Sequence, residues 1–276
     1  MPRKPRFAPA NYALHITQRG IYQQPVFFTD EDRNRFLTLV DQHAEDRRVL
    51  VHGYALMSNH IHLVVTGRED GAVSRLLQHV TGQYAQYLHG RLNRRGRLWQ
   101  SRFYSCVLDA HHFLSALAYV DLNPVRARVV DCAVDSAWSS AAAHSGRAAV
   151  MPEWLELEAL HSRVTPAGWQ ERLSQPQPRG EVAALRRATR TECPLGEPGF
   201  VEELEIKFQV RLRPLPPGPP AKKPAQAKEL SVEVARQAGT LRLAVRSGSS
   251  AARGESDPLR GAKLSYLRHG NCGHRL

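Results

Sequence analysis

The stretch YALMSNHIHLVV, residues Tyr54 to Val65, predicts two antiparallel β-strands joined by a tight turn. Ser58-Asn59 forms the turn, because asparagine tolerates the positive φ that tight hairpins require. Side chains alternate between the two faces of a strand, so His60 and His62 are expected side by side on one face. The opposite face of the same strand is apolar and suits a protein core, with Ile61, Leu63 and Val65.

This histidine pair is a candidate metal site. Two imidazoles held side by side on a rigid strand provide half of the ligands that a metal ion needs. Two histidines on a solvated face of a sheet would give the same pattern, however. The pair alone therefore leaves both interpretations open, and other parts of the chain must decide between them.

The composition favours a polyanionic partner. The chain has 276 residues, with 38 Lys and Arg against 26 Asp and Glu and a formal net charge of +12. Arginine pairs with phosphate through two parallel hydrogen bonds, so nucleic acid is favoured over a membrane. No apolar stretch follows the basic start MPRKPR. We therefore expect neither a signal peptide nor a membrane-spanning helix, and a cytoplasmic, nucleoid-associated protein.

The spacing of hydrophobic residues in the first half of the chain alternates between strand and helix periods. It predicts strands at 12–19, 49–57, 60–66 and 99–108, and helices at 30–47, 73–88 and 110–123. This order is the split β-α-β arrangement of ferredoxin-like folds with an added helix, an α+β fold with an antiparallel sheet. Helices on one face of such a sheet would leave the other face to meet a ligand.

Three segments are expected along the chain. Residues 1–145 carry the regular pattern and form the first domain. Residues 146–212 form a small helical module with helices at 181–190 and 201–210. Residues 213–276 form a Pro- and Arg-rich linker and a poorly ordered basic tail, because the run RPLPPGPPAKKPAQAK is typical of solvated, extended chain.

The helix at 110–123 supplies a candidate nucleophile. On a helical wheel Phe113, Leu114, Leu117 and Val120 cluster on one side, which we expect to pack on the sheet. Tyr119 falls on the opposite side, together with Asn123 and His112. Any amphipathic surface helix offers such a polar stripe, so the stripe by itself does not establish a site. The residue before proline avoids helical geometry, so Pro124 predicts a kink or a helix end at Asn123.

Taken together, these motifs resemble the REP-associated tyrosine transposases, which belong to the HUH (His–hydrophobic–His) single-tyrosine nucleases of bacteria. The resemblance runs from Tyr12 to about Ser140 and rests on HITQRG (15–20), DEDRNRFL (30–37), YALMSNHIHLVV (54–65), LWQSRFYSCVLD (98–109) and AYVDLNPVRA (118–127). This chain has Ser136-Ala137 where relatives typically carry Tyr-Pro, and its TECPLG at 191–196 lacks the usual Gly-Arg before the proline. These departures leave the nuclease centre untouched and put the contacts of the 146–212 module in doubt.

The resemblance implies a site and a reaction. It makes residues 1–145 a nuclease domain, His60 and His62 metal ligands, Asn123 a third ligand and Tyr119 the nucleophile. It implies Mg²⁺ or Mn²⁺ as the cofactor and single-stranded or hairpin DNA, such as a palindromic repeat, as the partner. Attack by the tyrosine would leave a 5′-phosphotyrosine and a free 3′-hydroxyl, so that strand joining needs no ATP.

Arginines are expected to bind the DNA phosphates, with a strong dependence on salt. The candidates are Arg19, Arg94, Arg95, Arg97, Arg102 and Arg126. Aromatic side chains able to stack on unpaired bases are Trp99, Phe103 and Tyr104, of which strand alternation assigns half to the core.

The sequence leaves open one alternative function and the state of assembly. One is a catalytically inactive protein that binds hairpin DNA on the same fold, for example as a repressor. The intact set of two histidines and a tyrosine argues against it, because a binding protein has no use for all three. Since one tyrosine supports one covalent intermediate at a time, moving an element requires either a homodimer or two sequential rounds.

Overall fold

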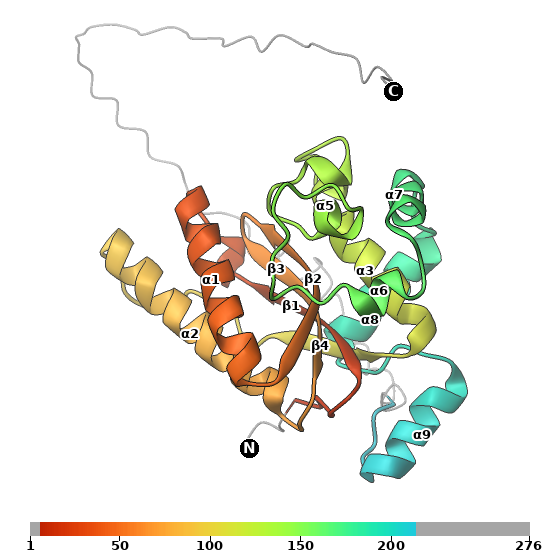
Figure 1. Cartoon of the computed structure of the whole chain (residues 1–276). Coiled ribbons are helices and arrows are strands. Elements are labelled where there is room, and N and C mark those ends of the chain that lie inside the picture. The colour runs from red at the N-terminus through yellow and green to blue at the C-terminus, as the bar shows by residue number, and fades with distance from the viewer. Residues whose placement is uncertain (1–5, 214–276) are drawn as a thin grey trace, which may run out of the picture. The chain divides into compact units, whose positions relative to one another are not determined.

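The computed structural model describes residues 6–213, built on a four-stranded antiparallel sheet with the strand order β2-β3-β1-β4 (Figure 1). The strands are β1 (Ala13–Arg19), β2 (Val49–Met57), β3 (His60–Gly67) and β4 (Tyr104–Leu108). Strands β2 and β3 form the expected hairpin, in which Met57 pairs with His60. This strand order is that of a ferredoxin-like sheet, so the fold class predicted from the sequence is confirmed.

Helices cover both faces of this sheet. The α-helices of the described residues are α1 (Asp30–Asp46), α2 (Ala72–Leu92), α3 (Ala110–Asp121), α4 (Asn123–Arg126), α5 (Ala141–His144), α6 (Glu158–His161), α7 (Pro166–Ser174), α8 (Arg179–Thr191) and α9 (Pro198–Phe208), and short 3-10 turns are η1 (Ile21–Gln23) and η2 (Ala133–Asp135). Helices α1 and α2 lie side by side on one side of the sheet, and α3 and α8 lie on the other (Figure 1).

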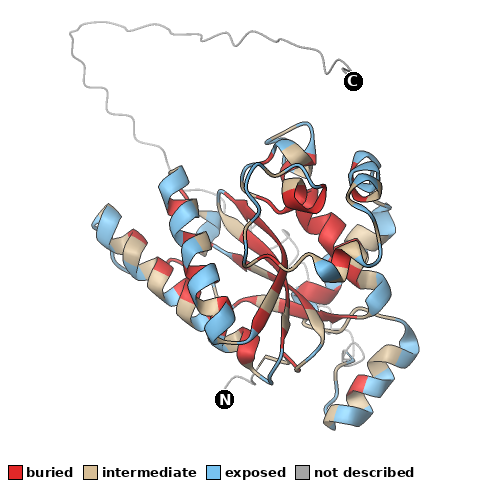
Figure 2. Cartoon of the chain, in the orientation of Figure 1, coloured by how far each residue is buried: buried red, intermediate tan, exposed pale blue. Residues whose placement is uncertain are grey.

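The first face packs as the strand pattern predicts. Ile61, Leu63 and Val65 are fully buried, in one core with apolar side chains of α1 and α2 such as Phe36 and Leu76. Side chains along β3 therefore alternate between this core and the face that carries the histidines. Figure 2 shows the strands at the centre as largely buried.

The second face is also covered, contrary to the expectation that it stays open. Val64 and Cys106 of the sheet pack with Leu117 of α3, Trp169 of α7 and Leu185 of α8 in a second apolar core. The expectation was wrong because this face of the strands is itself partly apolar, and helices beyond residue 145 supply the side chains that bury it. A ligand must therefore enter a cavity between the sheet and the helices.

A β-bulge in β2 allows α3 to approach the sheet closely. The register of β2 against β3 shifts between Val51 and Gly53. A Cβ atom at Gly53 would lie 2.7 Å from Leu117 Cδ2, so a larger residue there would have to displace the Leu117 side chain of α3. The missing side chain at Gly53 thus leaves room for Leu117 to pack on β2.

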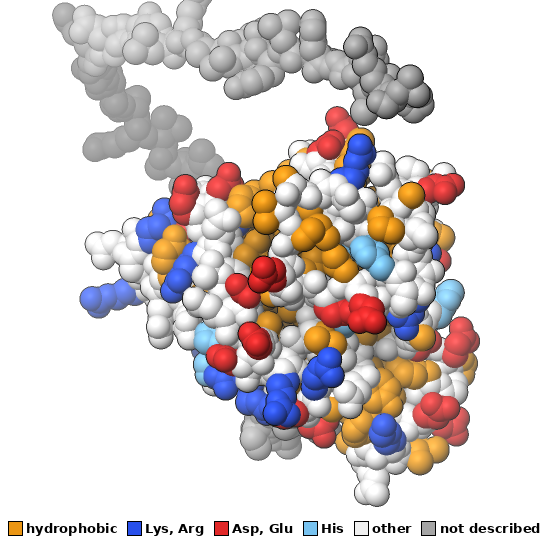
Figure 3. Space-filling model, viewed as in Figure 1, with side chains coloured by type: hydrophobic (Ala, Val, Ile, Leu, Met, Phe, Trp, Pro, Cys, Tyr) orange, Lys and Arg blue, Asp and Glu red, His pale blue; other side chains and the backbone are white. Residues whose placement is uncertain are grey.

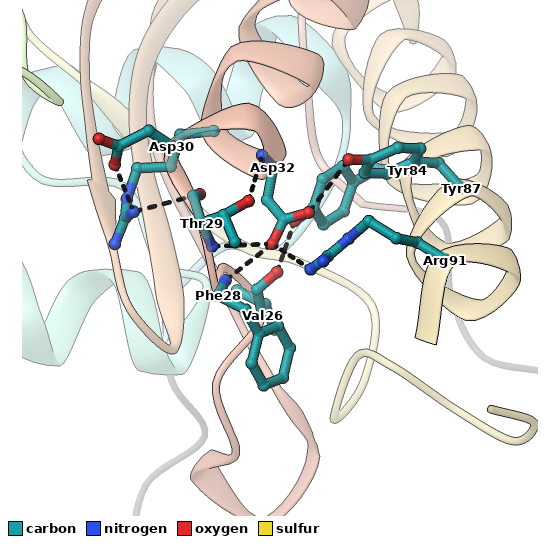
Figure 4. A network of polar contacts seen from close by, with 9 residues as sticks. Val26, Phe28, Thr29, Asp30, Asp32, Tyr84, Tyr87 and Arg91 are labelled. Carbon is teal, nitrogen blue, oxygen red and sulfur yellow. Dashed lines mark hydrogen bonds and ion pairs between the residues drawn. The ribbon is translucent and has the colours of Figure 1, made fainter. Parts of the chain in front are cut away.

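A buried carboxylate joins α1 to α2 (Figure 4). Thr29 and Asp32 form a reciprocal capping box at the start of α1. The Asp32 carboxylate also accepts hydrogen bonds from Phe28 N at 2.8 Å, from Tyr87 Oη at 3.1 Å and from Arg91 at 2.7 Å. Because its side chain is fully buried, these donors replace the water that the charge loses.

Two element boundaries differ from the prediction. Strand β4 begins at Tyr104 rather than at Trp99, which makes a single bridge to Gly20 and donates its indole N–H to Thr81 O. Trp99 and Phe103 give residues 99–103 the composition of a strand, but this segment is a loop whose aromatic side chains pack on the first apolar core. Helix α3 ends at Asp121, two residues before the predicted end, and α4 begins at Asn123, so the helix boundary expected at Asn123 is present. Pro124 lies in the first turn of α4, where its missing N–H has no partner to lose.

Beyond residue 145, helices α8 and α9 form where the sequence predicts them. Helices α7 and α8 pack on α3, and α8 also contacts β1 and β4. The division into 1–145 and 146–212 stays a prediction, and the expected tail falls, from residue 214 onward, outside the described residues. Within 6–213, no helix has the length and apolarity that crossing a membrane requires.

Candidate active site

A cavity of about 480 Å³ opens between the second face of the sheet and helices α3, α4 and α8. Its lining comes from strands β1, β3 and β4 as well as from those helices. The lining residues are His15, Thr17, Gln18, Arg19, His60, His62, Gln100, Tyr104, Tyr119, Asn123, Arg126, Ala127, Arg186, Thr189 and Arg190. All four residues predicted as metal ligands or nucleophile are therefore brought to one cavity.

The paired histidines lie side by side, as the strand alternation predicts. Their ring centroids are 5.0 Å apart, with the ring planes at 83°. His60 Nδ1 is 2.6 Å from Asn59 Oδ1, and His62 Nδ1 is 3.0 Å from His15 Nε2. In both rings Nδ1 is engaged by a neighbour, which leaves Nε2 as the atom able to bind a cation.

Burial keeps these rings neutral. It lowers the pKa of His60 to about 4, with Arg19 contributing. It also lowers the pKa of His62 well below the ordinary value, and the neighbouring His15 and His60 act in the same direction. A neutral imidazole is the form that coordinates a metal ion, so neither ring needs to lose a proton at neutral pH.

Tyr119 faces the sheet rather than solvent, which corrects the helical-wheel prediction. Its ring centroid is 5.5 Å from that of His62 and 5.6 Å from that of His15, both edge-to-face. Phe113, which the helical wheel assigns to the core, is buried as expected. Tyr119 is buried as well, with only 5% of its surface exposed. The wheel failed because α7 and α8 cover the outer side of α3, so that helix is buried nearly all round.

Two arginines hold the tyrosine. The Arg126 guanidinium lies over the ring at 4.2 Å from its centroid, and Arg186 Nε donates a hydrogen bond to Tyr119 Oη at 3.2 Å. Burial lowers the pKa of Arg126 to about 10, which leaves it charged at neutral pH. Positive charge therefore surrounds the hydroxyl, an arrangement that stabilises negative charge on it or on a nearby phosphate. His112, by contrast, bonds to Asp109 at the start of α3 and does not line the cavity.

Asn123 lines the same cavity and offers an amide oxygen, a group suited to a divalent cation. It is 7% exposed and donates from Nδ2 to Tyr119 O at 3.4 Å, which leaves Oδ1 as the atom suited to a cation. Among the described residues, no three His, Cys, Asp or Glu side chains gather as a metal site would require. Two imidazoles and an amide oxygen suit Mn²⁺ or a partly hydrated Mg²⁺ better than structural zinc.

The predicted DNA-binding arginines separate into two groups. Arg19 and Arg126 line the cavity. Arg94, Arg95 and Arg97 are exposed in the loop after α2, and Arg102 lines a second cavity of about 330 Å³. On the face in Figure 3, basic, acidic and apolar side chains are interspersed, so the positive charge is not gathered there.

Of the aromatic candidates, only Tyr104 lines the active-site cavity. Phe103 is 8% exposed and belongs to the first apolar core, and Trp99 packs against that core. An aromatic that the sequence reasoning passed over is far more accessible. Tyr22 in η1 is 92% exposed, at a φ of 51°.

Four residues that line the cavity around the paired histidines and Tyr119 were not predicted as part of the site. His15 could have been found, since strand alternation already places it on the polar face of β1. Arg186, Thr189 and Arg190 of α8 carry no local signal, because an amphipathic helix does not reveal which surface it will pack against.

Comparison with known proteins identifies the segment that carries this site. Residues 9–123 match the model of the family described as "Transposase IS200 like". Among solved structures, a REP-associated tyrosine transposase bound to a REP hairpin is 15% identical, with a TM-score of 0.46, covering 56% of this chain and 98% of its own. A transposase of Deinococcus radiodurans R1 is 13% identical, with a TM-score of 0.32, covering 44% of this chain and 96% of its own. No curated protein matches the chain significantly. The segment 9–123, which matches the IS200-like transposase family model, contains both paired histidines, Tyr119 and Asn123, in agreement with the sequence motifs.

Proposed function

We propose that this protein is a metal-dependent endonuclease and strand transferase that acts on single-stranded or hairpin DNA through a tyrosine–DNA ester. One observation carries the proposal. The hydroxyl-bearing ring of Tyr119 and the paired imidazoles of His60 and His62 line the same cavity, and Asn123 lines it too. A nucleophile and a cation site that share one cavity can act on the same phosphate.

In the proposed reaction, Tyr119 Oη attacks the phosphorus of a backbone phosphate. A bond forms between Oη and phosphorus while the bond from phosphorus to the 3′-oxygen breaks. The phenol proton passes to water, and the leaving 3′-oxygen takes up a proton to become a hydroxyl. The product is a 5′-phosphotyrosine, and attack by a 3′-hydroxyl reverses the step and joins strands.

His60, His62 and Asn123 would hold the Mg²⁺ or Mn²⁺ ion. Such an ion neutralises and polarises a non-bridging phosphate oxygen, which otherwise repels the nucleophile. The chain's own contribution is to present neutral imidazoles at fixed positions in the cavity between the sheet and α3. Their fixed separation on β3 means that little ligand reorganisation is needed.

The arginines act on charge. A tyrosine hydroxyl is a weak nucleophile at neutral pH and needs nearby positive charge to attack. Arg186 bonds to Oη directly and Arg126 lies over the ring, so both favour the charge that develops during attack. Arg19 and Arg190, exposed at the lining of the cavity, would hold phosphates on either side of the scissile one.

A DNA strand leaving the cavity past β3 would meet an aromatic surface. Gln23 O accepts a hydrogen bond from Asn59 Nδ2, and Asn59 contacts His60, so η1 adjoins the end of β3. Tyr22 belongs to η1 and its ring is exposed, so it would be available to stack on an unpaired base of a strand that passes this segment. The loop with Arg94 adjoins the same region, because Ile21 N donates to Leu98 O.

The test is covalent capture on a denaturing gel. The protein is incubated with a labelled hairpin oligonucleotide and Mn²⁺ or Mg²⁺. We expect a protein–DNA adduct that is lost in Tyr119→Phe and in His60→Ala, and retained in Tyr104→Phe, a matched control from the same cavity. Tight, salt-sensitive binding with neither adduct nor cleavage would instead favour the catalytically inactive hairpin-binding protein.

A further inference from the structure

A chain of buried hydrogen bonds leads from α8 through β1 to the histidine pair. Thr189 Oγ1 is 2.8 Å from Leu185 O and 2.7 Å from His15 Nδ1. On the far side of the same ring, His15 Nε2 is 3.0 Å from His62 Nδ1. His15 and Thr189 are each 2% exposed and His62 is 5% exposed, so water competes little for these contacts.

The carbonyl oxygen at the α8 end sets the direction of each hydrogen bond when both imidazole rings are neutral. A carbonyl oxygen only accepts, so the Thr189 hydroxyl donates to Leu185 O. The Thr189 oxygen must then accept from His15 Nδ1–H. As a neutral ring with its proton on Nδ1, His15 presents a lone pair at Nε2, which accepts from His62 Nδ1–H. The thiol of Cys106, 3.3 Å from Thr189 Oγ1, supplies a second donor to the same oxygen.

We propose that Thr189 and His15 are positioning residues that keep the proton of His62 on Nδ1 and so present Nε2 to the divalent cation. This inference rests on the proposed function and concerns the same site. Its consequence is that α8, which lies outside the family-matched segment 9–123, is part of the cation site. Outer hydrogen bonds of this kind orient a histidine ligand and raise its basicity.

Three substitutions on α8 isolate the hydroxyl. Thr189→Val keeps the shape of the side chain but removes the acceptor for His15 Nδ1–H, whereas Thr189→Ser retains it. Thr191→Val is the matched control, because the Thr191 hydroxyl bonds back to Arg187 O within the helix at 2.9 Å and is outside the cavity. Loss of an outer-sphere partner typically weakens metal binding by ~10–100-fold.

The experiment measures Mn²⁺ binding to the full-length, DNA-free protein by electron paramagnetic resonance of the unbound ion. We expect Kd to rise by ~10–100-fold in Thr189→Val and to change little in Thr189→Ser and Thr191→Val. A thermal melt of each metal-free variant reports whether it is folded. Wild-type-like Mn²⁺ binding by Thr189→Val would overturn the inference and leave the proposed function intact. Failure of the wild-type protein itself to bind Mn²⁺ would overturn the proposed cation site as well.

A second measurement needs no variant and therefore survives any failure of Thr189→Val to fold. Long-range ¹H–¹⁵N correlation spectra of the metal-free wild-type protein distinguish the two tautomers of each imidazole. We expect His62 and His15 both to carry the proton on Nδ1. A proton on Nε2 of His62 would contradict the inference.

Discussion

Replacing Arg186 by glutamine tests whether α8 takes part in catalysis. Arg186 Nε donates to Tyr119 Oη at 3.2 Å, so it touches the atom proposed to attack phosphorus. Glutamine keeps a hydrogen-bond donor but loses the charge. Two unit charges about 4 Å apart interact by ~1 kcal/mol in water and by ~4 kcal/mol near a protein surface.

The exposure of Arg186 places the expected loss toward the lower end of that range, at ~1.5–2.5 kcal/mol. Since ~1.4 kcal/mol corresponds to a factor of ten in rate, adduct formation should slow by ~10–100-fold. Arg126 remains over the ring, so the reaction should not be abolished. Arg186→Lys should recover part of the rate, because it restores the charge without the planar geometry.

The assay is single-turnover adduct formation with protein in excess over a labelled hairpin oligonucleotide, at fixed ionic strength. Hairpin affinity is measured in parallel by fluorescence anisotropy, so that weaker DNA binding is not mistaken for slower chemistry. Arg187→Gln is the control, since it removes the same charge from the next position of α8 but does not line the cavity. Equal rates for Arg186→Gln and Arg187→Gln would refute the reasoning.

Three further predictions concern stability and DNA contact. Asp32→Ala should lower the free energy of unfolding, measured in urea, by ~3–5 kcal/mol, because it removes a buried carboxylate from its partners. The control Asp30→Ala, at an exposed carboxylate, should lower it by less than ~1 kcal/mol. Equal losses in the two variants would contradict this account. His144 Nδ1 lies 2.7 Å from Asp121 Oδ2, and both side chains are fully buried, which we assign as a charged pair. Burial alone would lower the pKa of His144, but Asp121 outweighs it and the net pKa is raised. The stability that this pair contributes is therefore full below the ordinary histidine pKa and is lost as pH rises through the higher folded-state value. The stability difference between wild type and His144→Gln should accordingly shrink from pH 5.5 to pH 8.5, and a difference that widens would overturn the charged-pair assignment. Tyr22→Ala should weaken single-stranded DNA binding by ~1–3 kcal/mol while Tyr22→Phe does not, as anisotropy would report; unchanged binding would exclude base stacking there.

Local patterns in the sequence were sufficient for most of the strands and helices. The observed β2 is the predicted 49–57, and β3 begins at His60 directly after the predicted turn. Alternation between polar and apolar residues is a property of neighbours in sequence, so it survives folding. It also explains why the side-by-side placement of His60 and His62 could be predicted.

The coverage of the second sheet face could not be predicted in this way. A helical wheel ranks the faces of α3 relative to one another, but it cannot reveal that α7 and α8 bury the remaining side. For that reason Tyr119 was expected opposite the sheet and instead lies against His15 and His62.

The contacts of α8 depend on distance along the chain rather than on pattern. Thr189 and His15 are 174 positions apart and yet hydrogen-bonded. Only the tertiary structure brings them together, because no local propensity encodes a single long-range contact. The unpredicted part of the site is therefore the part that joins segments most distant in sequence.

The account depends most directly on which side chain becomes bonded to DNA. After reaction with a hairpin oligonucleotide, trypsin should release a peptide bounded by Arg102 and Arg126 that contains both Tyr104 and Tyr119. Fragmentation in a mass spectrometer assigns the attached 5′-phosphate to one of them. We predict the nucleotide on Tyr119, with a free 3′-hydroxyl on the released strand. A nucleotide on Tyr104, or cleavage that leaves no nucleotide on any tyrosine, would contradict the proposed chemistry.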